Sequence, residues 1–84
     1  MKRRILNING QDGIREVGDG FQAWNDAIGA DIGQIVPCLD GKHELWADEE
    51  GLCKGEPTIN VMASAMAGQP IVGSVILFRV GDIK

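Results

Sequence analysis

The sequence has little of what catalytic and metal sites are commonly built from. Its 84 residues include one histidine, two cysteines and no tyrosine. This set cannot supply a four-ligand zinc site without carboxylates, and neither cysteine belongs to a Cys-x-x-Cys pair. We therefore expect no metal and no cofactor. Cys38 and Cys53 are expected to be reduced thiols, and only an oxidising compartment would permit a disulfide between them.

A long hydrophobic run is also missing. The longest apolar stretch runs from Val75 to Phe78, whereas a membrane helix needs about 20 residues. The basic start, residues 1–4, is followed by an apolar stretch that breaks at Asn7 and Asn9, which is too short for a secretory signal. These absences predict a cytoplasmic protein with no membrane partner.

Positive charge is scarce as well. Eight lysines and arginines stand against twelve aspartates and glutamates, which gives a formal net charge of −4. General nucleic-acid binding needs a basic face that displaces counterions, so it is not expected here. A local basic pocket for one small anion remains compatible with this composition.

The patterns that are present predict one α+β domain over residues 1–84, in the order β-β-α-β-β-α-β. The expected strands cover residues 4–9, 14–17, 33–39, 42–48 and 71–80. A mostly antiparallel sheet with both short helices on one face is the simplest architecture that buries both helical stripes. The last strand is apolar on both faces, which predicts that it lies in the centre of the sheet or that other elements cover both of its faces.

The first helix is expected over residues 20–28. Asp19 and Gln22 have the spacing of a capping box, and Gly29 is a natural end. Its apolar stripe predicts a core containing Phe21 and Trp24.

The second helix is expected over residues 61–67. It would be capped by Asn60, or by Thr58 in a shifted alternative, and closed by Gly68. Its predicted apolar stripe consists of Ile59, Met62, Ala63 and Met66.

Asp40-Gly41 predicts a two-residue hairpin, with Pro37 at a sheet edge or at the end of pairing. This hairpin brings Cys38 near His43, but such proximity arises in any hairpin, so we expect no nucleophile there and no enzyme. The carboxylates of residues 48–50 are expected to form a solvated turn.

Four residues are the candidates for holding a ligand. Trp46 lies on the more polar face of its strand, where it would either be partly buried or serve as a stacking platform. The other candidates, which would hold an anion, are Lys54, Asn60 and Arg79.

From about residue 21 to residue 80 the chain resembles a family of small phage and plasmid proteins catalogued as domain of unknown function 3846. The resemblance rests on a helix ending at Gly29, an acidic turn with glycine at 48–52, a Gly-x-Pro loop at 55–57 before Asn60, and the glycine-bearing strand at 71–75. Members often carry a second glycine where this chain has Ala30, and usually an arginine where it has Val61. The resemblance implies an origin in a mobile element.

Two functional hypotheses follow. In the first, a phage-encoded, non-enzymatic protein inhibits host anti-phage defence by sequestering a nucleotide immune signal in the host cytoplasm. In the second, an acidic inhibitor or structural accessory docks on a host or phage protein by a sheet edge. In either case the small core, the strand limited by Pro37 and an exposed Trp46 predict a homo-oligomer.

Overall fold

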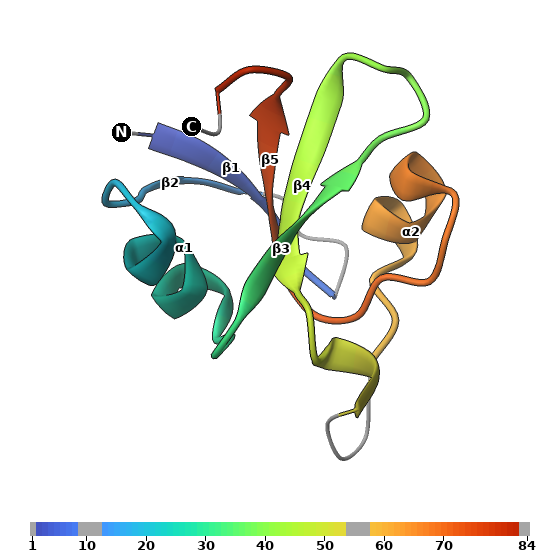
Figure 1. Ribbon diagram of the computed structural model, residues 1–84, viewed down its shortest axis with the longest axis horizontal. Coiled ribbons are helices and arrows are strands. Elements are labelled where there is room, and N and C mark those ends of the chain that lie inside the picture. Colours follow the sequence, from blue (N-terminus) through green and yellow to red (C-terminus); the bar gives the residue numbers. More distant parts are fainter. Residues whose placement is uncertain (1, 9–12, 54–57, 83–84) are drawn as a thin grey trace.

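The protein folds around one five-stranded antiparallel sheet with strand order β2-β1-β5-β4-β3 (Figure 1). The computed structural model describes residues 2–8, 13–53 and 58–82. The predicted α+β class and the order of elements are confirmed, with one added 3₁₀ turn at Gly51–Cys53. The strands are β1 (Lys2–Leu6), β2 (Gly13–Glu16), β3 (Gly33–Pro37), β4 (His43–Asp48) and β5 (Val75–Arg79).

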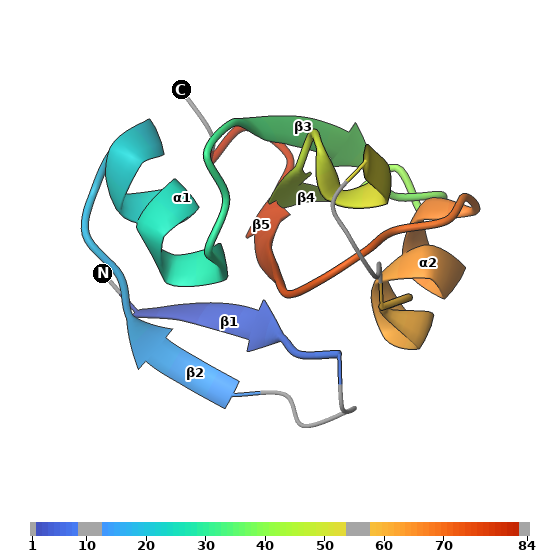
Figure 2. The ribbon, with the colours of Figure 1, turned by 90° about the horizontal axis from the view of Figure 1, so that it is seen from below.

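The helices α1 (Phe21–Ile28) and α2 (Val61–Ala67) lie on opposite faces of this sheet. Neighbouring residues of a strand point to opposite faces. Leu45 of β4 belongs to the core cluster of α2, and Trp46 belongs to that of α1. Figures 1 and 2 show the helices on either side of β5. The expectation that both helices cover one face is therefore wrong. We call the two sides the α1 face and the α2 face.

The central position of β5 explains why both faces need cover. Val75 and Ile76 are each 0% exposed, although they point to opposite sides of the sheet. A single helical layer would leave one of them in water, at a cost of about 1.5–3 kcal/mol for a side chain of this size. The prediction of a central last strand is confirmed, over a shorter range than expected because the chain turns at Gly73, where φ is 80°.

Local signals place the helix ends well, with one exception. α2 starts after Asn60, whose side chain accepts a hydrogen bond from the backbone of Ala63, and ends at Gly68 in the left-handed conformation. α1 ends at Gly29 in the same way. Its start has no side-chain cap, so the predicted role of Asp19 is wrong. The Gln22 amide instead donates to Asp26 within the helix.

The core holds smaller residues than the predicted stripes suggest. Ala63 and Ala67 of α2 are buried, while Met66 packs partly buried against the same cluster. Three predicted core residues are exposed instead: Phe21 at 56%, Ile59 at 45% and Met62 at 48%. α2 approaches the sheet through alanines, which brings its backbone close and leaves its longer side chains at the rim.

The β3–β4 hairpin forms as predicted, but its loop is longer than two residues. Cys38 and His43 still pair through a backbone hydrogen bond of 3.0 Å. The chain therefore turns through residues 39–42, with Gly41 in the left-handed conformation. Pro37 lies on the outer strand β3, as expected. Asn9, the end of the first predicted strand, and the Gly-x-Pro loop at 55–57 lie outside the described residues. Among the described residues, no helix has the length and apolar character that crossing a membrane requires.

Candidate anion-binding site

α2 covers only part of its face of the sheet, and the uncovered part is basic. Lys2 and Arg4 are alternate residues of β1, so their side chains share this face. Arg4 lies opposite Leu77 of β5, and Arg79 of β5 lies opposite His43 of β4. The start of β1, the end of β5 and the start of β4 thus bring cationic groups together around Leu77. We call these residues, Lys2, Arg4, His43, Leu77 and Arg79, the basic face.

The basic face is hollowed. A cavity of about 230 Å³ is lined by all five of its residues and also by Arg3, Phe78 and Asp82. A second hollow of about 420 Å³ is lined by Lys42, His43, Arg79 and Val80. His43 and Arg79 line both hollows, so the two form neighbouring parts of one concave region that opens to solvent.

Three cationic side chains of this region are available to a ligand. Lys2, Arg4 and Arg79 are exposed, and none of them forms an ion pair with a carboxylate of the described residues. Arg3 differs from them, because its guanidinium lies 4.6 Å from the centre of the Phe78 ring and 3.7 Å from Asp82. The chain therefore holds Arg3 in its own structure and leaves the other three groups to solvent.

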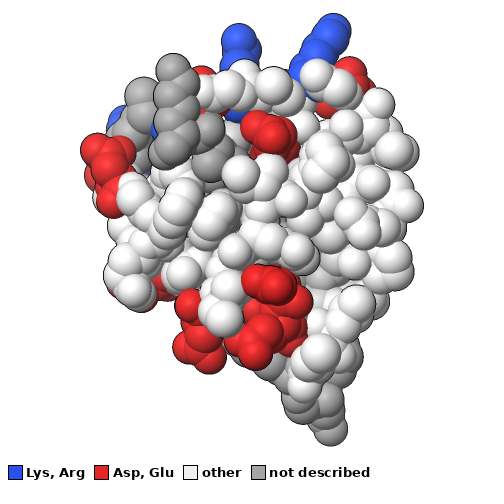
Figure 3. Space-filling model, in the orientation of Figure 1, with Lys and Arg blue, Asp and Glu red and all other residues white. Residues whose placement is uncertain are grey.

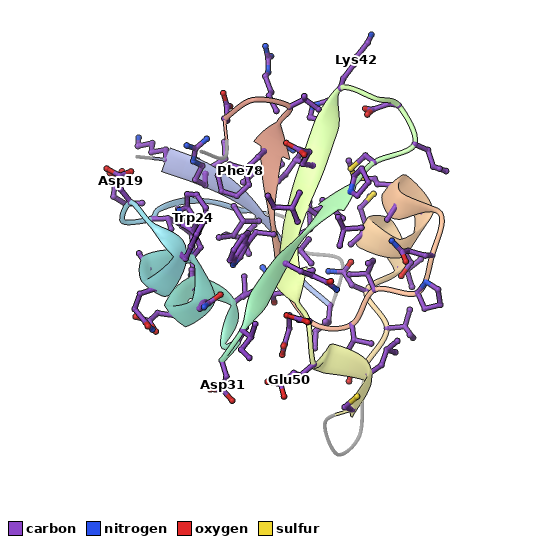
Figure 4. All side chains as sticks on the ribbon, in the orientation of Figure 1. Asp19, Trp24, Asp31, Lys42, Glu50 and Phe78 are labelled. Atoms are coloured by element: carbon purple, nitrogen blue, oxygen red, sulfur yellow. The ribbon has the colours of Figure 1, made fainter. Side chains whose placement is uncertain are left out.

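Charge is distributed unevenly over the molecule. In Figure 3 blue side chains lie at the upper end, where red side chains also occur, and a larger group of red side chains lies at the lower end. Figure 4 places Lys42 at the first end and Asp31 and Glu50 at the second. A protein of net charge −4 can in this way present a basic region, because most of its acidic groups lie elsewhere.

His43 is fixed at the edge of the cavity by Asp40. The ring nitrogen Nδ1 lies 2.7 Å from Asp40 Oδ2. The other carboxylate oxygen accepts hydrogen bonds from the backbone N–H groups of Lys42 and His43. The bond with the His43 ring, followed by that from Lys42, lowers the pKa of Asp40. The loop thereby keeps its own aspartate ionised and hydrogen-bonded, and the aspartate orients the imidazole beside the cavity.

Trp46, predicted as a stacking platform, is not accessible to a ligand. It is 5% exposed. The Phe21 ring stacks on it at 5.1 Å between centroids, and Trp24 packs edge-on at 5.2 Å. Its indole N–H donates to Asn25. The ring is therefore core, beside Trp24 and Phe78, which Figure 4 shows between α1 and the sheet. Its polar strand neighbours Glu44 and Asp48 misled the sequence-based prediction.

The other three predicted site residues, Lys54, Asn60 and Arg79, do not lie together. Asn60 is 0% exposed, and its amide donates to the carbonyl oxygens of Leu6 and Gly73 at 2.9 Å each. It serves the fold and cannot reach a ligand. Lys54 lies outside the described residues. Arg79 lines the cavity, as an anion-binding residue should. The prediction missed Lys2, Arg4 and His43. Lys2 and Arg4 belong to a run of three basic residues, 2–4, whose first and third members share a face once the run forms a strand. No local pattern pointed to His43.

Neither cysteine lines the two hollows, and the acidic turn at residues 48–50 lies apart from them. Both thiols are free, with Cys38 buried and Cys53 exposed. Burial, followed by the nearby carboxylates of Asp40 and Glu44, raises the pKa of Cys38, which disfavours the thiolate that a nucleophile needs. Asp48 accepts a hydrogen bond from the backbone of Glu50, as in a tight surface turn. Within the described ranges, no group of three or more His, Cys, Asp or Glu is placed to hold a metal ion.

Comparison with protein-family models, with curated proteins and with solved structures finds no match for this chain. The resemblance to domain of unknown function 3846 therefore stays a prediction, and the functional argument rests on the basic face.

Proposed function

We propose that the protein binds a small anionic ligand of the nucleotide class on its basic face and holds it without converting it. The observation that carries this proposal is the convergence of Lys2, Arg4 and Arg79 on one hollow in an acidic protein. Like charges brought together on two neighbouring strands repel one another. An anion bound between them removes that repulsion, so the site gains more from a phosphate than isolated surface cations would.

The chemistry of these side chains favours phosphate. A guanidinium presents a planar fork of N–H donors that matches phosphate oxygens, and such charge-assisted hydrogen bonds are about twice as strong as neutral ones. Guanidinium planes also stack on nucleobases, so Arg4 or Arg79 takes the stacking role first given to Trp46. Leu77 supplies an apolar floor. Together these groups suit a ligand with a phosphate and a flat ring.

Sequestration fits this site better than catalysis does. The imidazole of His43, a candidate general base beside the cavity, is hydrogen-bonded to Asp40. The buried thiol of Cys38 is disfavoured as a nucleophile. With the phage origin that the family resemblance implies, we propose that the ligand is a nucleotide signal of host defence and that the protein acts in the host cytoplasm.

The test is a thermal-shift panel of linear and cyclic nucleotides with the full chain. A ligand that binds only the folded state at about 100 times its dissociation constant stabilises by about 2.7 kcal/mol, which raises the melting temperature of so small a domain by several degrees. The ligand is then recovered after heat denaturation and its mass measured. Unchanged mass supports sequestration, altered mass makes the protein an enzyme, and no shift across the panel refutes nucleotide binding.

A further inference from the structure

The outer strand β3 has a free edge whose hydrogen-bonding groups can be assigned. Cys38 N–H donates to His43 C=O, and Glu49 N–H donates to Ile32 C=O, in the same β3–β4 register. Hydrogen-bonded and non-hydrogen-bonded pairs alternate along an antiparallel ladder. Gly33, Ile35 and Pro37 therefore direct their backbone groups away from β4. No strand lies beyond them in the described sheet, where β3 is last in order.

This edge lacks the usual protection against pairing. Charged side chains or a proline commonly prevent a free strand edge from pairing with another chain. The opposite edge, β2, carries Arg15 and Glu16. β3 has the sequence Gly-Gln-Ile-Val-Pro and contains no charged residue. Its one protective feature is Pro37, at the end of the strand.

Exposed apolar side chains accompany the free edge. Ile35 is 44% exposed and lies opposite Trp46, on which Phe21 stacks with 56% of its own surface exposed. Ile32, directly before the strand, is 51% exposed. Ile35 and Phe21 thus present apolar surface on the α1 face beside the unpaired backbone, which is the combination that a strand-pairing partner covers.

The charge distribution indicates which partner fits. The β3 start lies near Asp31 and Asp48, and its end leads to the loop that carries both Asp40 and Lys42 (Figure 4). When two copies pair their β3 strands antiparallel about a two-fold axis, the acidic start of each lies beside the loop of the other, where Lys42 offers a positive charge. Parallel pairing would instead bring the two acidic starts together.

We propose that two copies of this chain associate through their β3 edges, antiparallel and centred on Ile35. Ile35 N–H then donates to Ile35 C=O of the second copy, and reciprocally. Gly33 N–H donates to Pro37 C=O of the second copy, so this register uses the proline as an acceptor and does not need the N–H that it lacks. The Ile35 side chains meet directly on the α1 face. This dimer rests on the fold alone and is independent of the proposed ligand.

The experiment is sedimentation equilibrium on the wild type, Ile35→Lys and Ile14→Lys. Ile35→Lys places two like charges opposite each other in the dimer and should weaken self-association at least tenfold. Ile14 is the matched control, because it is also an exposed isoleucine on an edge strand, at 63% exposure. Its substitution should leave association unchanged. Circular dichroism melting confirms that both variants fold.

A cross-linking measurement tests the register. In a Cys53→Ser background, Ile35→Cys should form a covalent dimer on mild oxidation, and Ile14→Cys should not. A monomeric wild type at high micromolar concentration overturns the proposal. So does association that survives Ile35→Lys, or that Ile14→Lys alone abolishes.

Discussion

The indole N–H of Trp46 donates a hydrogen bond of 2.9 Å to the side-chain oxygen of Asn25, and both side chains are buried. Trp46→Phe removes the donor and leaves the Asn25 oxygen without it, which should cost about 1–3 kcal/mol of unfolding free energy. Adding Asn25→Leu removes both polar partners, so the double variant should be more stable than the sum of the two single changes predicts. Urea unfolding measures all three variants. The Trp46→Phe variant should bind nucleotide with the affinity of the wild type. A large loss of affinity would indicate that Trp46 contacts the ligand after all.

Gly33 is required by the position of the same indole ring. A Cβ atom at Gly33 would lie 2.3 Å from Trp46 Nε1 and Cε2. Gly33→Ala should therefore displace the ring and cost about 1–3 kcal/mol, as for other over-packed sites. Gly13→Ala on the opposite edge strand is the control, because no heavy atom lies within 4 Å of its Cβ position. Equal stability of the two variants by urea unfolding would contradict the packing described here.

Asn60 links the start of α2 to the end of β1 and to the turn at Gly73 through both ends of its amide. Its oxygen accepts from Ala63 N–H, and its nitrogen donates to Leu6 and Gly73. Asn60→Ala should cost about 2–4 kcal/mol, from a lost cap and two buried carbonyls left unpaired. Asn60→Asp keeps the cap but cannot donate, so it should also destabilise. Thermal melting distinguishes the helix-capping role from the hydrogen-bond donor role. An Asn60→Asp variant as stable as the wild type would show that Asn60 stabilises the fold only as a helix cap.

The sequence predicted local features better than the arrangement of the sheet. Gly29, Asn60 and Gly68 act at helix ends through their own backbone or side chain, so their roles follow from neighbours in the chain. The side on which each helix packs depends on how the chain crosses the sheet. Val75 and Ile76 are both apolar and point to opposite faces of the sheet, which already indicated that both faces are covered. This signal should have been preferred to the simpler arrangement with both helices on one face.

The candidate site depended on contacts that are distant in sequence. Lys2, Arg4 and Arg79 meet because β1 pairs with β5, the first strand with the last. No local pattern fixes that pairing. Trp46 was misjudged for a similar reason, since α1 and Phe21 cover it from another part of the chain.

The link between Asp40 and His43 should make stability depend on pH in acid. The folded-state pKa of Asp40 lies below its ordinary value, because of the His43 ring and then the Lys42 backbone N–H. Asp40 therefore stabilises the fold above about pH 4, its ordinary pKa, and this contribution is lost as the pH falls through the lower folded value. Asp40→Asn should be less stable than the wild type at pH 6, with the difference vanishing near the acid limit. A difference that persists unchanged in acid would contradict this role.

Calorimetric titration of the best nucleotide from the panel tests the basic face most directly. Arg4→Ala and Arg79→Ala each remove a charge-assisted contact worth about 1.5–3 kcal/mol, so each should weaken binding about 10- to 100-fold. Arg15→Ala removes a cation whose guanidinium lies away from the cavity and donates to Ala27 C=O, and it should bind as the wild type does. Wild-type affinity in Arg4→Ala and Arg79→Ala, or an equal loss in Arg15→Ala, would contradict a binding site on the basic face.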